Sequence, residues 1–261
     1  LPGREEASTN ITHVAAKLGR WGTCPGAFRA PKWGTRNDWS ASYVATLNLA
    51  DHVYVLCVDD CDSIYLPGPI ARKATLVDGR AFDVCDSADF YGLDHYKRAS
   101  LSHAAAVADA ITNRKFKNVA IVEEDSSSPT AASFVHAANK PSTLGLTASD
   151  LGQFKAALEG DDWSFFRMGW RQYTLEISPA MSCPPECACE RRGEKLCFVA
   201  AGGCDLRSSD SYIVSSRYME WMLEQLINGG TVDYNVLPAA PGTLLVTPLM
   251  SIQGRLDIPA E

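Results

Sequence analysis

The sequence predicts an α/β protein with a mostly parallel, doubly wound sheet flanked by helices. Short apolar runs rich in β-branched residues alternate along the chain with amphipathic helical segments, which is the element order of a parallel sheet with helical crossovers. The run Val53–Val58, "VYVLCV", is apolar throughout, as expected of a strand buried on both faces. The length of 261 residues fits one large α/β domain, or one domain with an extension.

Each element follows from a local pattern. Residues 1–45 hold Pro, Gly, Trp and basic residues without a period, so we expect an irregular N-terminal extension before a domain over 46–261. The helix expected over 215–228 has the clearest pattern, because its apolar residues recur on one face between a serine cap and a glycine pair. The strands are expected at 53–58, 74–77, 119–122, 164–168 and 244–246. The other helices are expected at 100–113 and 149–158, and a loop at 126–146.

Five of the nine cysteines lie between Cys183 and Cys204. Their spacings, CxxxC and CxC followed by gaps of seven and six residues, do not match the two short pairs that most zinc sites use. The pattern therefore favours disulfides in an oxidising compartment, with zinc as the alternative. We expect a disulfide-stapled, Cys-rich loop over 182–204. Together with a glycosylation sequon at Asn10, this predicts a luminal domain of the secretory pathway, in the Golgi or endoplasmic reticulum.

Charge and hydropathy exclude other classes of protein. The net charge is −7 and the isoelectric point is near 5.3, which argues against a nucleic-acid partner because phosphate contacts need clustered Lys and Arg. No apolar run approaches the ~20 residues of a membrane span. The sequence begins with Leu, so we expect any membrane anchor to lie outside it.

Three consecutive carboxylates, Glu123, Glu124 and Asp125, directly follow the predicted strand 119–122. Ligands of doubly wound sheets bind beyond the carboxyl ends of strands, and carboxylate oxygens suit Mg²⁺ and Mn²⁺. On an extended backbone the first and third side chains point to the same side, so Glu123 and Asp125 are expected to converge on one cation while Glu124 faces away. A solvated loop, a helix N-terminus or a Ca²⁺-binding domain are the alternatives.

Five stretches carry a resemblance to a known family. They are "ATLVDGRAF", "SLSHAAAVADAI", "VAIVEEDS", "SDSYIVSSRYMEWML" followed by "VDYNVL", and "VTPLMSIQG". In this order, over 51–253, they resemble glycosyltransferase family 25, which includes lipooligosaccharide and collagen galactosyltransferases. The resemblance implies a GT-A-type, Rossmann-like fold, a UDP-sugar donor with galactose the commonest sugar, Mn²⁺ (or Mg²⁺) as cofactor, and a hydroxyl of a glycoprotein or glycan as acceptor.

The resemblance also implies roles for individual carboxylates. It makes Asp125 a metal ligand and Glu123 a metal ligand or a ribose contact. The family resemblance suggests inversion at the sugar, which requires a carboxylate base that deprotonates the acceptor. Asp210, in "SSDSY", and Asp233, in "VDY", are the two candidates for this base.

Four further residues are candidates for nucleotide or substrate contacts. His103 matches the family's "SH" position and either contacts substrate or hydrogen-bonds a loop near the start of its helix. Asp78 matches a "dG" turn and is a nucleotide contact or purely structural. Asp59 is a candidate contact to the base or ribose, and Arg207 to phosphate.

The chain departs from the family after its first strand. There the family has a basic segment near the nucleotide, whereas this chain has "VLCVDDCDSIYL". In place of that basic segment, Cys57 and Cys61 are close enough in sequence to form a disulfide with each other. The acidic replacement supports an alternative function, a non-catalytic carbohydrate- or nucleotide-binding domain that retains the transferase fold.

Overall fold

The computed structural model describes residues 26–36, 38–83, 95–114, 116–128, 145–169, 171–172, 189–200, 206–207, 209–228, 230–232, 236–237, 240–247 and 250–253. The strands are β1 (Phe28–Arg29), β2 (Lys32–Trp33), β3 (His52–Cys57), β4 (Tyr65–Leu66), β5 (Ala74–Asp78), β6 (Asn118–Glu123), β7 (Ser126–Ser127), β8 (Phe165–Arg167), β9 (Arg171–Gln172), β10 (Cys189–Arg191), β11 (Cys197–Ala200), β12 (Leu206–Arg207), β13 (Ser211–Ser215), β14 (Thr243–Thr247) and β15 (Ile252–Gln253). The α-helices are α2 (Ala41–Leu47), α3 (Gly68–Ala71), α4 (His95–Asp109), α5 (Ala148–Leu158) and α6 (Ser216–Ile227). A 3₁₀ helix spans Gly79–Asp83, and a π-helical segment spans Ala110–Arg114.

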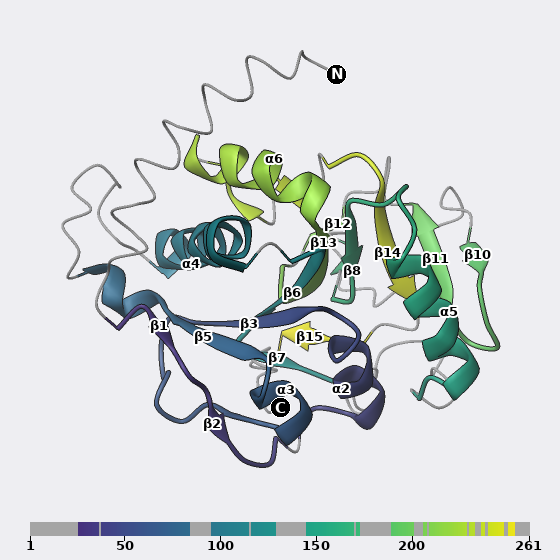
Figure 1. Ribbon diagram of the computed structural model, residues 1–261, viewed down its shortest axis with the longest axis horizontal. Coiled ribbons are helices and arrows are strands. Elements are labelled where there is room, and N and C mark those ends of the chain that lie inside the picture. The colour runs from purple at the N-terminus through teal and green to yellow at the C-terminus, as the bar shows by residue number, and fades with distance from the viewer. Residues whose placement is uncertain are drawn as a thin grey trace, which may run out of the picture.

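One nine-stranded sheet runs through the molecule, in the order β1-β5-β3-β6-β13-β8-β14-β11-β10 (Figure 1). Strands β5, β3 and β6 are parallel neighbours, and β8 is parallel to β14. Strand β13 is antiparallel to both β6 and β8, and the two ends of the sheet are also antiparallel. The predicted α/β class with flanking helices is confirmed, and the sheet is more mixed than expected.

Helices cover both faces of the sheet (Figure 1). Helices α4 and α6 pack on one face, where Tyr54 and Leu56 of β3 join the buried cluster. Helices α2, α3 and α5 pack on the other face, against Val53 and Val55. This burial of alternate residues on both faces explains the unbroken apolar run of β3. No helix in the described ranges combines the length and apolar character of a membrane span.

Four expectations from the sequence need correction. The segment 126–146, expected to be a loop, begins with strand β7, which pairs with β15. The described part of the segment expected to be irregular contains β1, which pairs with β5 at the edge of the main sheet, and most of α2. The Cys-rich segment expected to be a loop contains the antiparallel pair β10–β11. The helix expected from residue 100 begins at His95 and ends in the π-helical segment. The proposed domain boundary at residue 46 stays a prediction.

Helix α6 matches its prediction closely. Ser215 is its N-cap residue and Asn228 its C-cap. Its buried residues are Met219, Met222, Leu223 and Leu226, four members of the predicted apolar stripe, while the fifth, Ile227, is partly buried. Helix α5 also matches, and Thr147 and Asp150 form a capping box at its start.

Candidate functional site

The sheet topology gathers acidic residues at one edge. Parallel strands β5, β3 and β6 all end there, so Asp78, Asp59 and Glu123 follow one another across the sheet. Because β13 runs the opposite way, its start lies at the same edge, and the backbone N–H of Glu123 donates to the carbonyl of Asp210 at 2.9 Å. Four carboxylates singled out from the sequence thus share one edge of the sheet.

A buried hydrogen-bond chain holds the side chain of Glu123. Its Oε1 lies 3.1 Å from Nε2 of His103 and accepts from the Ser209 hydroxyl at 2.5 Å. The other ring nitrogen, Nδ1, lies 2.7 Å from the hydroxyl of Tyr212. A carboxylate only accepts, so Nε2 carries the proton; in the neutral ring, Nδ1 then accepts from Tyr212. His103 is 1% exposed and lies in the second half of α4, not at a helix start.

Asp125 lies in an environment that opposes its negative charge. Burial, followed by the charges of Glu123, Asp210 and Glu124, raises the pKa of Asp125 to about 7. Strand β6 ends at Glu123, and residues 124–125 form a turn, so strand alternation does not bring Asp125 to this position. The charge of Glu123 nonetheless acts on Asp125, while the predicted convergence of the two on one cation stays a prediction. A divalent cation would relieve their repulsion and favour ionised Asp125.

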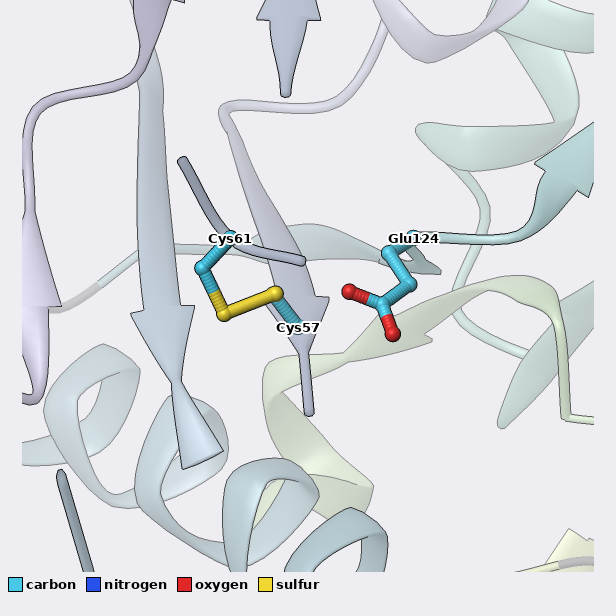
Figure 2. Close-up of side chains that lie close together, drawn as sticks. All are labelled: Cys57, Cys61 and Glu124. Atoms are coloured by element: carbon cyan, nitrogen blue, oxygen red, sulfur yellow. A yellow bond between two sulfur atoms is a disulfide. The ribbon is translucent and has the colours of Figure 1, made fainter. Parts of the chain in front are cut away.

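Glu124, in the turn after β6, has its own set of neighbours. Its Oε1 accepts from the backbone N–H of Asp59 at 3.1 Å. Its carboxylate turns toward the disulfide between Cys57 and Cys61 (Figure 2). The guanidinium of Arg36 donates to its backbone carbonyl at 2.5 Å.

The potential cation ligands at this edge are of two kinds, disulfide sulfurs and carboxylate oxygens. Among the described residues, the group of three potential ligands within 4.8 Å of one another is Cys57, Cys61 and Glu124. Sulfurs in a disulfide are not thiolates, so this group is not a metal centre. Glu123 and Asp125 are not members of such a group. A cation held by them would take its other ligands from water and a bound phosphate, which is how proteins commonly hold Mg²⁺.

Asp210 is buried and part of a second polar network. It is 1% exposed, and its Oδ2 accepts from the Ser251 hydroxyl. Ser251 lies 2.8 Å from the hydroxyl of Ser126, which lies 2.9 Å from that of Tyr43. A Cβ added to Gly169 would lie 2.2 Å from the same Asp210 oxygen, so the backbone closes tightly over this carboxylate. In this arrangement the Asp210 carboxylate is a buried hydrogen-bond acceptor within the protein and does not face a site for an acceptor substrate.

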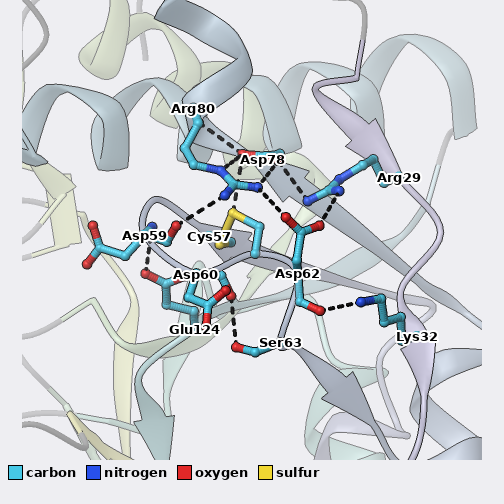
Figure 3. Close-up of polar contacts among 11 residues, drawn as sticks. Arg29, Lys32, Cys57, Asp59, Asp60, Asp62, Ser63, Asp78, Arg80 and Glu124 are labelled. Atoms are coloured by element: carbon cyan, nitrogen blue, oxygen red, sulfur yellow. Dashed lines mark hydrogen bonds and ion pairs between the residues drawn. A yellow bond between two sulfur atoms is a disulfide. The ribbon is translucent and has the colours of Figure 1, made fainter.

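Asp78 anchors an ion-pair cluster (Figure 3). Its Oδ2 lies 2.7 Å from Arg29 and 2.8 Å from Arg80. Both arginines also contact Asp62, and hydrogen bonding from Arg29 is the main cause that lowers the Asp62 pKa. The carbonyl of Asp59 accepts from Arg80 at 3.4 Å, while its side chain is exposed. These contacts fit the structural alternative for Asp78.

Two predicted residues remain without side-chain geometry. Asp233 lies outside the described residues, so its role stays a prediction. Arg207 pairs with Arg171 between β12 and β9, and only its backbone is described.

The structure adds residues that the sequence did not single out: Tyr212, Ser209, Ser251, Arg29 and Arg80. Tyr212 and Ser209 flank the predicted Asp210, so proximity to that residue was their one available signal. Arg29 lies in the segment expected to be irregular, and nothing in its local pattern points to Asp78.

Comparison of the sequence with protein-family models gives no match, and comparison with curated proteins gives no significant one. Fold and site together define an α/β protein with a carboxylate-rich edge at the ends of its parallel strands.

Proposed function

We propose that this protein is a metal-dependent glycosyltransferase that moves a sugar from a UDP-sugar to a hydroxyl of a glycoprotein or glycan, with inversion. The main support is the position of Glu123 and Asp125 at the carboxyl end of β6, where burial, followed by the charges of Glu123, Asp210 and Glu124, raises the pKa of Asp125. The five sequence stretches that resemble glycosyltransferase family 25 supply the donor and acceptor classes. The resemblance to a GT-A-type fold belongs to the same proposal.

Residues of this edge divide into two roles in the proposal. Glu123 and Asp125 would hold Mn²⁺ or Mg²⁺, and a bound cation would neutralise charge developing on the departing diphosphate. His103 and Ser209 orient Glu123 by hydrogen bonding.

The proposed transfer breaks the bond between the sugar's anomeric carbon and the diphosphate oxygen, which keeps the electron pair. The acceptor oxygen forms a new bond to the same carbon from the opposite face, and its proton passes to a carboxylate base. Asp233 and Asp210 are the candidates. Because Asp210 is buried and bonded to Ser251, Asp233 is the favoured one.

The test is release of UDP from a panel of UDP-sugars in the presence of Mn²⁺. We expect Asp125→Asn to lower turnover at least about 100-fold, because the cation loses a charged ligand. The matched control is Asp162→Asn, since Asp162 is an exposed carboxylate after α5. Turnover that persists in Asp125→Asn, or no binding of any UDP-sugar in calorimetry, would overturn the proposal.

A second candidate function is a non-catalytic domain that binds a nucleotide or carbohydrate. One observation favours it: Arg29 and Arg80 at the end of β5 are already paired with Asp78 and Asp62, so their charge is largely compensated. Metal-dependent UDP binding without turnover would support this candidate. Melting that responds to Ca²⁺ but not to nucleotide would instead indicate a Ca²⁺-binding domain.

The proposed location is the lumen of the secretory pathway. The Cys57–Cys61 disulfide and the disulfide-bonded state of Cys197 support it, because disulfides persist in oxidising compartments.

A further inference from the structure

A concave surface lies between β2, α2 and α3, next to the candidate site. It is a pocket of about 860 Å³, within the range of small-molecule sites. We call it the Trp33 pocket. Its lining is mostly apolar and includes Trp33, Arg36, Trp39, Val44, Asn48 and Pro67.

Trp33 is held in place although it is exposed. Its side chain is 79% exposed, which is unusual for the largest aromatic residue. A Cβ added to Gly68 would lie 2.8 Å from its Nε1, so the indole edge rests on backbone that only glycine leaves open. An ordered, exposed indole offers a flat apolar contact surface at little entropic cost to binding.

The charge of the pocket argues for a neutral ligand. Among its described lining residues, Arg36 alone is charged, and it pairs with Asp38 at 3.1 Å. Its guanidinium also lies 4.6 Å from the ring centre of Trp39. A phosphate or carboxylate would find no uncommitted cation here. A pyranose ring fits better, because it has an apolar C–H face for the indole and hydroxyls for the polar lining residues Thr35 and Asn48.

Hydrogen bonds connect the pocket wall to the acidic turn. Arg36 donates to the carbonyls of Glu124 at 2.5 Å and Ser126 at 2.9 Å. The indole N–H of Trp39 donates to the same Ser126 carbonyl at 2.8 Å. The wall of the Trp33 pocket is therefore bonded to residues on both sides of Asp125.

We propose that the Trp33 pocket binds a neutral saccharide unit of the acceptor, stacked on Trp33, while the acceptor hydroxyl reaches the acidic edge. The role of this saccharide as an acceptor rests on the proposed transferase function. Saccharide binding itself does not depend on turnover, so it is tested separately.

The experiment measures binding of neutral tetrasaccharides of galactose, mannose, glucose and N-acetylglucosamine by calorimetry and saturation-transfer NMR, without donor or metal. We expect at least one to bind, with NMR contacts to an indole. Trp33→Ala should weaken its affinity about tenfold or more, and Trp33→Tyr should retain most of it. The matched control is Lys155→Ala on the exposed face of α5, which should bind as the wild type does. Melting curves confirm that each variant is folded.

Failure of every probe to bind, or equal binding by Trp33→Ala, would overturn the inference. Binding of a proline-rich peptide in the pocket with no saccharide bound would overturn it too, because aromatic grooves also accept such peptides. Saccharide binding through Trp33 without binding of any UDP-sugar would support the pocket and contradict the proposed transferase function. Turnover of UDP-sugars with no saccharide bound at Trp33 would support the transferase function and contradict the pocket.

Discussion

His103 on α4 and Glu123 at the end of β6 lie 3.1 Å apart, joined by one hydrogen bond inside the core. Two sequence stretches separated by about twenty residues meet here. A third, β13, contributes Tyr212, whose hydroxyl hydrogen-bonds to His103. Because His103 and Tyr212 are buried and Glu123 accepts hydrogen bonds from both His103 and Ser209, Glu123 has little freedom to reorient. If Glu123 holds the proposed cation, its orientation is set by groups that would not touch the cation.

We expect Tyr212→Phe to weaken Mn²⁺ binding about tenfold, since groups behind a ligand commonly tune affinity by this amount. Loss of the hydroxyl leaves Nδ1 of His103 without this hydrogen bond and costs about 1–2 kcal/mol of stability. Calorimetry with Mn²⁺ and urea denaturation measure the two effects.

Tyr54→Phe is the matched control for that experiment. The Tyr54 hydroxyl donates to Asp109 at 2.7 Å, from a buried strand to the same helix α4 but away from the acidic edge. Its loss should cost similar stability and leave Mn²⁺ affinity unchanged. Equal affinity loss in both variants would mean that the effect is general destabilisation.

The raised pKa of Asp125 predicts a pH-dependent stability in EDTA. An ordinary Asp pKa is near 4, whereas burial and the neighbouring carboxylates raise that of Asp125 to about 7. Between these values the folded state binds more protons than the unfolded state, so stability falls as the pH rises. Asp125→Asn removes this loss and should be more stable than the wild type at pH 8, with the advantage shrinking toward pH 4. Thermal melts across this range measure it.

Asp162→Asn, which changes an exposed carboxylate, controls for net charge in the same melts. An Asp125→Asn variant that is no more stable than this control at pH 8 would show that the folded protein does not raise the pKa of Asp125, by burial or by repulsion.

Removing the Cys57–Cys61 disulfide should lower stability by about 2 kcal/mol, the chain-entropy value for so short a loop. Cys57→Ala, Cys61→Ala and the double variant should lose nearly the same amount, because either change breaks the bond. Urea denaturation measures the three values. Losses that add in the double variant would indicate that side-chain packing, not the bond, supplies the stability.

Asp150 should be one of the most sensitive positions outside the acidic edge. Its carboxylate accepts from Thr147 at the start of α5, and from the backbone of Lys195 and Leu196 ahead of β11. Burial would raise its pKa, but these bonds lower it to about 2. Asp150→Ala should cost about 3 kcal/mol at pH 7, combining a lost cap with unsatisfied backbone donors.

The sign of the pH effect follows from the lowered pKa of Asp150. Its contribution is present above about pH 4 and is lost as the pH falls toward 2, so wild type and Asp150→Ala should converge there. The control is Asp161→Ala, which breaks only an exposed ion pair with Arg217 and should change stability little. An Asp150→Ala variant as stable as this control at pH 7 contradicts the prediction.

Local pattern was enough to locate β3, β6 and α6, because each buries a continuous run or a regular stripe of apolar residues. It was not enough for β1, which has two residues and exists only because β5 offers it an edge. The run Leu196–Val199 is apolar, but its cysteine equally fits a disulfide-stapled loop, so the local pattern does not specify β11.

The acidic edge was predictable only in part. A strand that ends in carboxylates indicates where Glu123 and Asp125 lie, whatever the rest of the sheet does. The contacts of Ser209 and Tyr212 depend on β13 being antiparallel to β6, and no local pattern in the sequence specifies that direction. The pairing of Arg29 with Asp78 likewise requires contacts between distant segments.

The place of β14 in the sheet has a consequence for biosynthesis. Although it follows β8, β10, β11 and β13 in the chain, it lies between β8 and β11, and β10 joins the sheet only through β11. A nascent chain that has not yet released residues 243–247 from the ribosome cannot complete this sheet, and its earlier cysteines would have to wait for, or oxidise ahead of, the insertion of β14. Nonsense mutations before Thr243 should therefore yield a protein that is cleared by quality control rather than a shortened but folded one.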